Sequence, residues 1–359
     1  MRPFRVPNKV YEPDDKEFNR TKFQLPYVPD NMQKQQCLEC GCLFELPWLE
    51  KRSPLTSIKS HNGCVWRRRT VMIECPDCKY PVEHELPHQK AKGKYGFFGD
   101  EASRITKNEL IFTLSVVGCD HIHLERIESL VHQFKIGLEP DRPADTWTLH
   151  MTKLRSGQQR KKDPIFGNWS DAKVMACIDG LFKLIDSFGP YFIMVNATGV
   201  LVRPSSKKEI ANSQYFLQQE VYAALLMDTI DISTKNSIKP YFIFDSVKDS
   251  AAETIVHEWA RDAFLGSQQS LLYAHLTHGI DIPEPEFVKP ASRPLLEIAD
   301  FVSYVIARYL YCRFEKVNID LDPVRLGEMK YIGFDHVGDL ITTGRHQVGF
   351  PWNSFWKYK

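Results

Sequence analysis

The 359-residue chain lacks several features that would assign it at once to a common class of protein. It has no run of roughly 18 apolar residues, the length that a membrane-spanning helix needs, so we expect no membrane partner. Its N-terminal stretch has no apolar core of the signal-peptide kind, and we therefore expect a cytoplasmic protein. A glycine-rich phosphate loop, a Gly-x-Ser-x-Gly elbow and internal repeats are also missing, which argues against Rossmann and α/β-hydrolase sites.

Net charge is nearly absent, at +1, but the charges are unevenly distributed. Of the 46 basic and 45 acidic residues, 17 and 12 lie in residues 1–94, which leaves 29 and 33 for residues 95–359. A basic N-terminal part beside a slightly acidic body is typical of a nucleic-acid-binding module attached to a metal-binding domain. Chance asymmetry on a solvated surface is the alternative.

Cysteine is concentrated near the N-terminus, with six of the nine in the first 78 residues. Cys37 and Cys40 form one Cys-x-x-Cys pair, and Cys75 and Cys78 form another. Two such turns can supply the four thiolates of a structural zinc site, whereas disulfides are uncommon in the cytoplasm. We therefore predict a zinc-ribbon-like module over residues 31–90. Buried or redox-active thiols are the alternative.

The segment between the two cysteine pairs adds further candidates. Three residues are substitute zinc ligands: Cys42, His61 and Cys64. Three arginines beside Trp66 are candidate nucleic-acid contacts, because guanidinium groups pair with phosphates and an aromatic ring stacks on bases: Arg67, Arg68 and Arg69. A solvated strand face would have the same composition.

Alternating strand and helix patterns predict an α/β domain over residues 91–320, with a mixed sheet flanked by helices. A polar linker is expected at 81–94, and extensions are expected at 1–30 and 321–359. Short apolar runs predict strands at 95–98, 109–117, 191–200, 240–245 and 271–276. Periodic or capped segments predict helices at 122–137, 171–188, 206–229, 250–265 and 292–314.

Acidic residues stand in apolar settings at three places in this body. Asp100 and Glu101 follow the first strand, Asp245 ends a later strand, and Asp300 interrupts the most apolar helix. Buried carboxylates are costly unless they are paired, hydrogen-bonded or bound to a cation. Acids from separate elements can converge on Mg²⁺ or Mn²⁺, and two such ions would stabilise a phosphodiester displacement.

Each acid also has an ordinary explanation. Asp100 can begin a β-turn, Asp245 can cap the next turn, and Asp300 can pair with Lys289 or Arg308. Neighbouring residues of a strand point to opposite faces, so Asp100 and Glu101 reach one site only if the strand has ended.

With these acids the chain resembles the bacterial RNase H-like family catalogued as "domain of unknown function 3800". The family's first strand ends in Asp-Glu-Ser-Gly, where this chain has Asp100, Glu101, Ala102 and Ser103. A later strand that ends in Asp is matched by Asp245, and a late Leu-Gln-x-Ala-Asp helix is matched by the residues from Leu296 to Asp300. The family's Glu-x-His is matched only at His150, because Thr148 stands where the Glu would be.

The resemblance implies an RNase H-like fold and a metal-dependent nuclease, in some relatives near defence or mobile genes. The active site would contain five residues: Asp100, Glu101, Asp245, Asp300 and His150. His150 could carry a proton or orient water, or it could be an ordinary surface or core histidine. Lys153 and Arg155 begin a basic loop at 153–162 that could contact a phosphate backbone, or simply be solvated.

Two functional hypotheses follow. The first is a nuclease with Mg²⁺ or Mn²⁺ at the acids and a structural zinc module that binds nucleic acid or a protein partner. The second is an inactive RNase H-like scaffold that binds nucleic acid or protein, which the absence of an acid at Thr148 favours. A defence effector within a larger complex shares the chemistry of the first, and the aromatic, basic C-terminal tail would dock on a partner or fold back.

Overall fold

The computed structural model describes residues 34–46, 55–61, 64–203, 205–245, 271–288, 293–327, 329–337 and 340–347. The predicted helix at 250–265 and the C-terminal tail lie outside these ranges. The chain divides into two compact units. The first comprises Met1–Lys94, Met227–Pro240 and Ala260–Glu284, and the second comprises Tyr95–Leu226, Tyr241–Trp259 and Pro285–Lys359. The first unit therefore includes later stretches that a contiguous N-terminal module would not have.

The first unit contains small antiparallel sheets. One pairs β1 (Lys34–Gln36) with β2 (Leu43–Glu45), and the other has the order β3 (Leu55–His61), β4 (Cys64–Glu74), β5 (Pro81–Glu85). The predicted linker at 81–94 is therefore wrong at both ends, because Pro81–Glu85 pairs with β4 and β6 begins at Gly93. Val82 and Leu86 are buried in the core of this unit, which explains the pairing.

The stretch Leu271–Leu276, which was predicted as a strand, is the short helix α7. Leu271 and His275 are both buried and lie one helical turn apart, so helical packing onto the first unit buries them together. A six-residue apolar run does not distinguish a strand from a buried helix by its periodicity.

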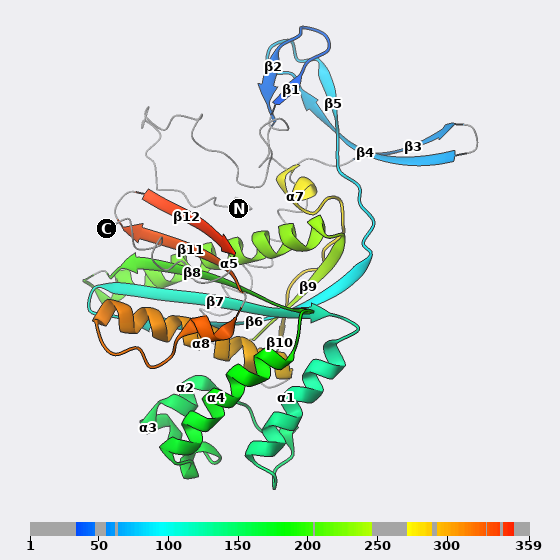
Figure 1. Cartoon of the computed structure of the whole chain (residues 1–359). Coiled ribbons are helices and arrows are strands. Elements are labelled where there is room, and N and C mark those ends of the chain that lie inside the picture. Colours follow the sequence, from blue (N-terminus) through cyan, green and yellow to red (C-terminus); the bar gives the residue numbers. More distant parts are fainter. Residues whose placement is uncertain are drawn as a thin grey trace. The chain divides into compact units, whose positions relative to one another are not determined.

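The second unit is built on a mixed seven-stranded sheet with the order β10-β9-β6-β7-β8-β11-β12 (Figure 1). β6 (Gly93–Ile105), β7 (Glu109–Asp120) and β8 (Phe192–Val202) form an antiparallel meander. On one side β9 (Ile238–Asp245) is parallel to β10 (Glu286–Val288). On the other side β11 (Lys330–Val337) is parallel to β8 and antiparallel to β12 (Leu340–Gln347), so residues expected to form an extension add two strands.

Helices cover both faces of this sheet. They are α1 (Leu124–Leu138), α2 (Met151–Arg155), α3 (Gly157–Arg160), α4 (Asp171–Ser187), α5 (Lys207–Lys235) and α8 (Pro294–Glu315). Phe98 of β6 and Ile243 of β9 belong to the core formed with α1, α4 and α8, whereas Phe97 stacks on Phe242 on the opposite face. Figure 1 shows α8 and α5 on opposite sides of the sheet. No helix among the described residues has both the length and the apolar content needed to cross a membrane.

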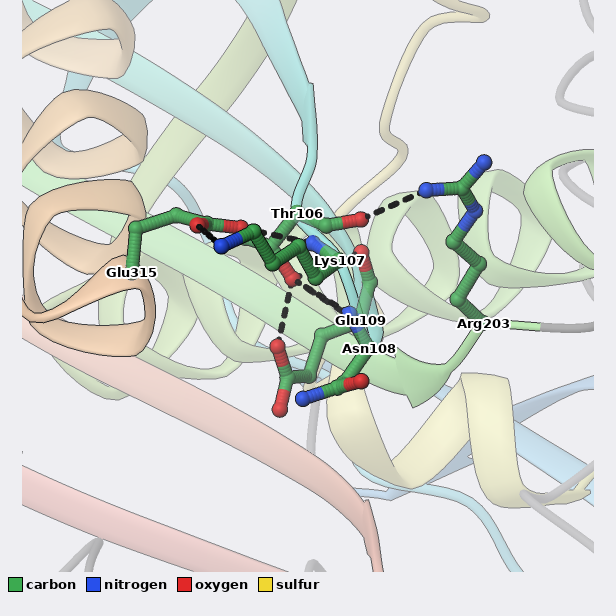
Figure 2. A network of polar contacts seen from close by, with 6 residues as sticks. All are labelled: Thr106, Lys107, Asn108, Glu109, Arg203 and Glu315. Carbon is green, nitrogen blue, oxygen red and sulfur yellow. Dashed lines mark hydrogen bonds and ion pairs between the residues drawn. The ribbon is translucent and has the colours of Figure 1, made fainter.

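The tip of the β6–β7 hairpin joins three elements, as Figure 2 shows. The hydroxyl of Thr106 accepts from the backbone N–H of Glu109 at 2.8 Å, which closes the turn. Arg203, after β8, donates from its guanidinium to the carbonyl of Thr106 at 3.0 Å. Glu315, at the end of α8, accepts from the N–H of Lys107 at 2.6 Å. These contacts anchor the C-terminal end of α8 to the hairpin and help to fix its position along the sheet.

Candidate functional sites

The four paired cysteines come together in the first unit. Cys37 and Cys40 lie between β1 and β2, and Cys75 and Cys78 lie between β4 and β5. Their Sγ atoms all lie within 4.8 Å of one another, with 3.5 Å between Cys37 and Cys78 and 3.7 Å between Cys40 and Cys75. Four thiolates at this spacing can hold a metal ion such as zinc.

The two turns have matching backbone geometry. In each, the N–H of the first cysteine (Cys37 or Cys75) donates to the carbonyl five residues later at 2.9 Å, and the N–H four residues later donates back at 2.9 or 3.0 Å. That fourth residue has positive φ in both turns, at 76° for Gly41 and 60° for Lys79. The cysteine pairs are thus equivalent, and Cys42 occupies the position that a tyrosine has in the second turn.

Cys42 is the main competitor of these ligands. Its Sγ lies 3.2 Å from that of Cys75, and it forms a second close group with Cys40 and Asp77. Burial raises the pKa of Cys75, but hydrogen bonds from the Cys78 backbone, the Cys42 thiol and the Asp77 backbone lower it to about 6. The hydrogen bond to Cys75 raises the pKa of Cys42. The Tyr80 backbone lowers the pKa of Cys78, but burial and the neighbouring thiols raise it to about 12. The equivalent backbone turns, rather than these pKa values, therefore favour the paired cysteines over Cys42 as the ligands.

Along one side of α8, among apolar neighbours, lie three buried polar side chains. Glu297, Asp300 and Ser303 follow one another at intervals of three residues, with exposed fractions of 4%, 6% and 0%. The hydroxyl of Ser303 donates to the carbonyl oxygen of Asp100, 2.6 Å away. This contact brings the acid-bearing part of α8 directly against the acid-bearing part of β6.

Asp300 binds the segment that contains His150. Its Oδ2 accepts the N–H of Met151 at 2.7 Å and lies 3.0 Å from Nδ1 of His150. The hydrogen bond to Asp300 raises the pKa of His150 against the effect of burial, and the negative charges of Asp300 and Asp245 raise it further. With 43% of its side chain exposed, His150 connects the buried acid to solvent. The alternative pairing of Asp300 with Arg308 is wrong, because Arg308 pairs with Asp320 at 3.1 Å.

The pKa of Asp100 is affected by the charges of both other predicted acids, Asp245 and Asp300. Burial raises its pKa well above the usual value, and the negative charges of Asp300 and Asp245 raise it further, while the N–H of Glu101 opposes the shift from 2.7 Å. Protonation or a bound cation would relieve this repulsion. The cluster is looser than that of the cysteines: within the described ranges, every group of three or more ligand atoms lying within 4.8 Å of one another contains cysteines.

Glu101 lies on the opposite face of the sheet. The strand was expected to end before the acids, but β6 continues to Ile105 and keeps its pairing with β7. The side chain of Glu101 accepts from the hydroxyl of Tyr222 on α5 at 3.2 Å. Burial raises the pKa of Tyr222, and the charges of Glu101, Asp100 and Asp245 add to the shift. Strand alternation therefore separates Glu101 from Asp100.

A buried ion pair that was not predicted lies one turn from Asp300. Nζ of Lys135 on α1 is 2.6 Å from Oε1 of Glu297, and the two side chains are 2% and 3% exposed. Lys135 also donates to the carbonyl of Trp147, and Oε2 of Glu297 accepts the N–H of Leu149 at 2.8 Å. The pair thus holds the segment that leads into His150. Its signal in the sequence was the acid three residues before Asp300.

Buried polar side chains lie beside Asp100 on the next two strands of the sheet. Asp100 is paired with Ser115 on β7, which is paired with Asn196 on β8. The amide nitrogen of Asn196 donates to Thr113 at 2.7 Å and to Ser115 at 2.8 Å, and its oxygen accepts from Thr198 at 2.9 Å. These four side chains are wholly buried, so their mutual hydrogen bonds are needed to offset the loss of water.

The predicted phosphate contacts differ in availability. The expected loop at 153–162 forms the short helices α2 and α3 instead. Arg155 is largely buried and pairs with Asp320, whereas Lys153 is exposed next to His150 and lowers its pKa. Lys161 and Lys162 are exposed directly after α3. Arg67, Arg68 and Arg69 lie in β4, where only the side chain of Arg69, half-buried, belongs to the described part.

No protein-family model matches the chain, and a search of curated proteins finds no significant match. The RNase H-like resemblance therefore stays a prediction from the motifs.

We expect the zinc content to distinguish the cysteines. Cys37→Ser should remove a ligand and abolish tight binding of zinc at this site, whereas Cys42→Ser should retain it, because only the paired cysteines occupy equivalent turns. Zinc would be quantified with a chromophoric chelator after denaturation of the purified protein. Loss of the same zinc equivalent in Cys42→Ser would place Cys42 in the ligand set.

The buried ion pair should show strong coupling. Lys135→Met leaves the carboxylate of Glu297 buried without its cation and should lower the free energy of unfolding by about 3–5 kcal/mol. The double variant Lys135→Met/Glu297→Leu should recover much of this loss, because it removes both charges. Urea denaturation of the wild type, the two single variants and the double variant gives the coupling energy. Purely additive losses would contradict the role assigned to this pair.

Proposed function

We propose that the chain is a divalent-metal-dependent nuclease. The observation that carries this proposal is the placement of Asp100 and Asp245 on neighbouring strands and of Asp300 on the helix whose Ser303 contacts the Asp100 carbonyl. The charges of Asp245 and Asp300 accordingly raise the pKa of Asp100. Carboxylates gathered in this way suit Mg²⁺ or Mn²⁺. Two ions about 3.5–4 Å apart do not require all the acids to meet at one point, which fits a looser cluster.

In this proposal the three aspartates hold the ions and water is the nucleophile. The ions would stabilise the attacking and leaving oxygens of a phosphodiester. His150 would move a proton between the site and solvent, since its ring joins Asp300 to the surface. The order of the acids along the chain (first strand, later strand, late helix) supports an RNase H-like comparison.

The substrate would be a nucleic acid, which exposed lysines near the site favour. Lys153 lies close enough to His150 to affect its pKa, and Lys161 and Lys162 are exposed at the end of α3. Arg155 is a weaker candidate than predicted, because Asp320 neutralises it. The cysteine module would bind nucleic acid or a protein partner. A defence or mobile-element setting belongs to the resemblance alone.

The second candidate is an inactive scaffold that binds nucleic acid or protein. It is favoured by Thr148, which stands where the similar family has an acid, and by Glu101, whose contact with Tyr222 places it on the other face. This candidate predicts binding that does not depend on divalent ions.

We expect the purified chain to cleave DNA or RNA with Mg²⁺ or Mn²⁺. Asp100→Asn and Asp300→Asn should each lower the rate by at least ~100-fold, since even outer-shell changes at metal sites cost 10–100-fold. The matched control is Asp179→Asn, which should leave the rate unchanged. Asp179 lies on the exposed side of α4 and pairs with Arg325. Four substrates would be used: single- and double-stranded DNA and RNA. Equal rates, or equal inactivity, for the wild type and both variants would favour the scaffold.

Asp100→Asn should also stabilise the metal-free protein at neutral pH. Folding raises the pKa of Asp100 above the value of 3.8 that the group has in the unfolded chain. The protonated group therefore stabilises the fold at low pH, and this stability is lost as the pH rises through the raised pKa. The variant cannot ionise, so its gain in melting temperature should be present at pH 8 and shrink toward pH 5. Mn²⁺ should stabilise the wild type more than the variant. A variant less stable than the wild type at pH 8 would contradict the repulsion.

A further inference from the structure

In the first unit, the ring nitrogens of two histidines face each other. His84 lies on β5, and His275 lies on α7. Their Nε2 atoms are 3.0 Å apart, and the ring centroids are 5.3 Å apart. His275 is 8% exposed, so the pair lies at the edge of the core of this unit.

The far side of the His84 ring fixes its tautomer. Nδ1 of His84 lies 3.0 Å from Oε1 of Gln35. With this oxygen as acceptor, Nδ1 carries the proton, and Nε2 directs a lone pair toward His275. Histidine ligands of metals are oriented in the same way, with the second nitrogen bonded to an oxygen.

Both rings are kept in the neutral form that metals bind. Burial lowers the pKa of His84. Burial, together with the nearby His84 and His278, lowers the pKa of His275 to about 4. These surroundings favour the neutral imidazole that a metal binds, and the 3.0 Å approach of the two Nε2 atoms sets where an ion would lie.

We propose that His84 and His275 bind a divalent transition metal of the zinc class through their Nε2 atoms. Two such nitrogens, each about 2.0–2.1 Å from one ion, lie roughly 3.0–3.4 Å apart, so the observed spacing needs little adjustment. These two nitrogens are half the number of ligands at the cysteine site, and water or another side chain would complete the coordination. The site is thus weaker and more exchangeable than the cysteine site.

One further imidazole, that of His278, lies near enough to His275 to affect its pKa. His278 follows His275 by three residues and holds a left-handed backbone, with φ of 49°. Its carbonyl accepts the N–H of Gln89 at 2.8 Å, which joins α7 to the segment that follows β5. Strained non-glycine residues of this kind cluster at ligand sites.

A metal here would join α7 to the strand that leaves the cysteine turns. The proposal is independent of the nuclease, because its ligands, its unit and its readout differ from those of the aspartates. An N–H···N hydrogen bond without metal is the competing explanation of the same spacing.

The test is a calorimetric titration of the full chain with Zn²⁺ after the cysteine site has been loaded. We expect the wild type to bind one further equivalent, which EDTA removes before the cysteine-bound zinc. His84→Asn and His275→Asn should bind this equivalent at least ~100-fold more weakly, and Gln35→Ala about 10-fold more weakly. His121→Asn, at an exposed histidine of the second unit, is the control and should match the wild type.

Absence of the further equivalent in the wild type would overturn the proposal and leave the hydrogen bond. Its retention in both histidine variants would do the same. If those variants also lose the cysteine-bound zinc, and so fail to fold, Gln35→Ala decides: it keeps both imidazoles, and an affinity equal to that of the wild type overturns the proposal. The nuclease assay can fail without affecting any of these results.

Discussion

The second unit depends on one constraint, the burial of three polar side chains on α8. A carboxylate inside an apolar helix is tolerated only if its oxygens are satisfied, and the partners of these side chains come from three other segments. Glu297 binds Lys135 of α1 and the N–H of Leu149. Asp300 binds His150 and the N–H of Met151. Ser303 donates to the carbonyl of Asp100. The helix thereby fixes α1, the segment before α2 and β6 relative to one another.

The two units meet the problem of stability by different means. The second has an extensive apolar core between its sheet and the helices α1, α4 and α8, and the burial of this core offsets the cost of the buried acids. In the described part of the first unit, the core cluster has nine buried residues, two of which are Cys37 and Cys75. Small modules of this kind commonly rely on a metal, because the binding free energy becomes folding free energy. The matching turns at Cys37 and Cys75 are consistent with that reliance.

Local signals account for what the sequence predicted. The Cys-x-x-Cys turns and the acids inside apolar segments are visible within a few residues, and the cysteines do converge. Of the Lys135–Glu297 pair, only the acid inside the apolar helix is visible locally, because its partner lies 162 positions away. Arg155 looked available because its partner, Asp320, is equally distant in sequence. β6 was expected to end early because polar residues follow Phe98, yet pairing with β7 decides where a strand ends.

Asp300 shows how the parts of the site depend on one another. Its Oδ2 carries both hydrogen bonds, to His150 and to Met151, and Oδ1 takes part in neither. A carboxylate held through one oxygen can present the other in a fixed direction, which is how hydrogen-bonded ligands are oriented at metal sites. The segment that provides these bonds is itself held by Glu297, one turn earlier on the same helix. The orientation of the Asp300 carboxylate therefore depends on the ion pair beside it. A substitution at Lys135 would alter that orientation although Lys135 does not contact Asp300.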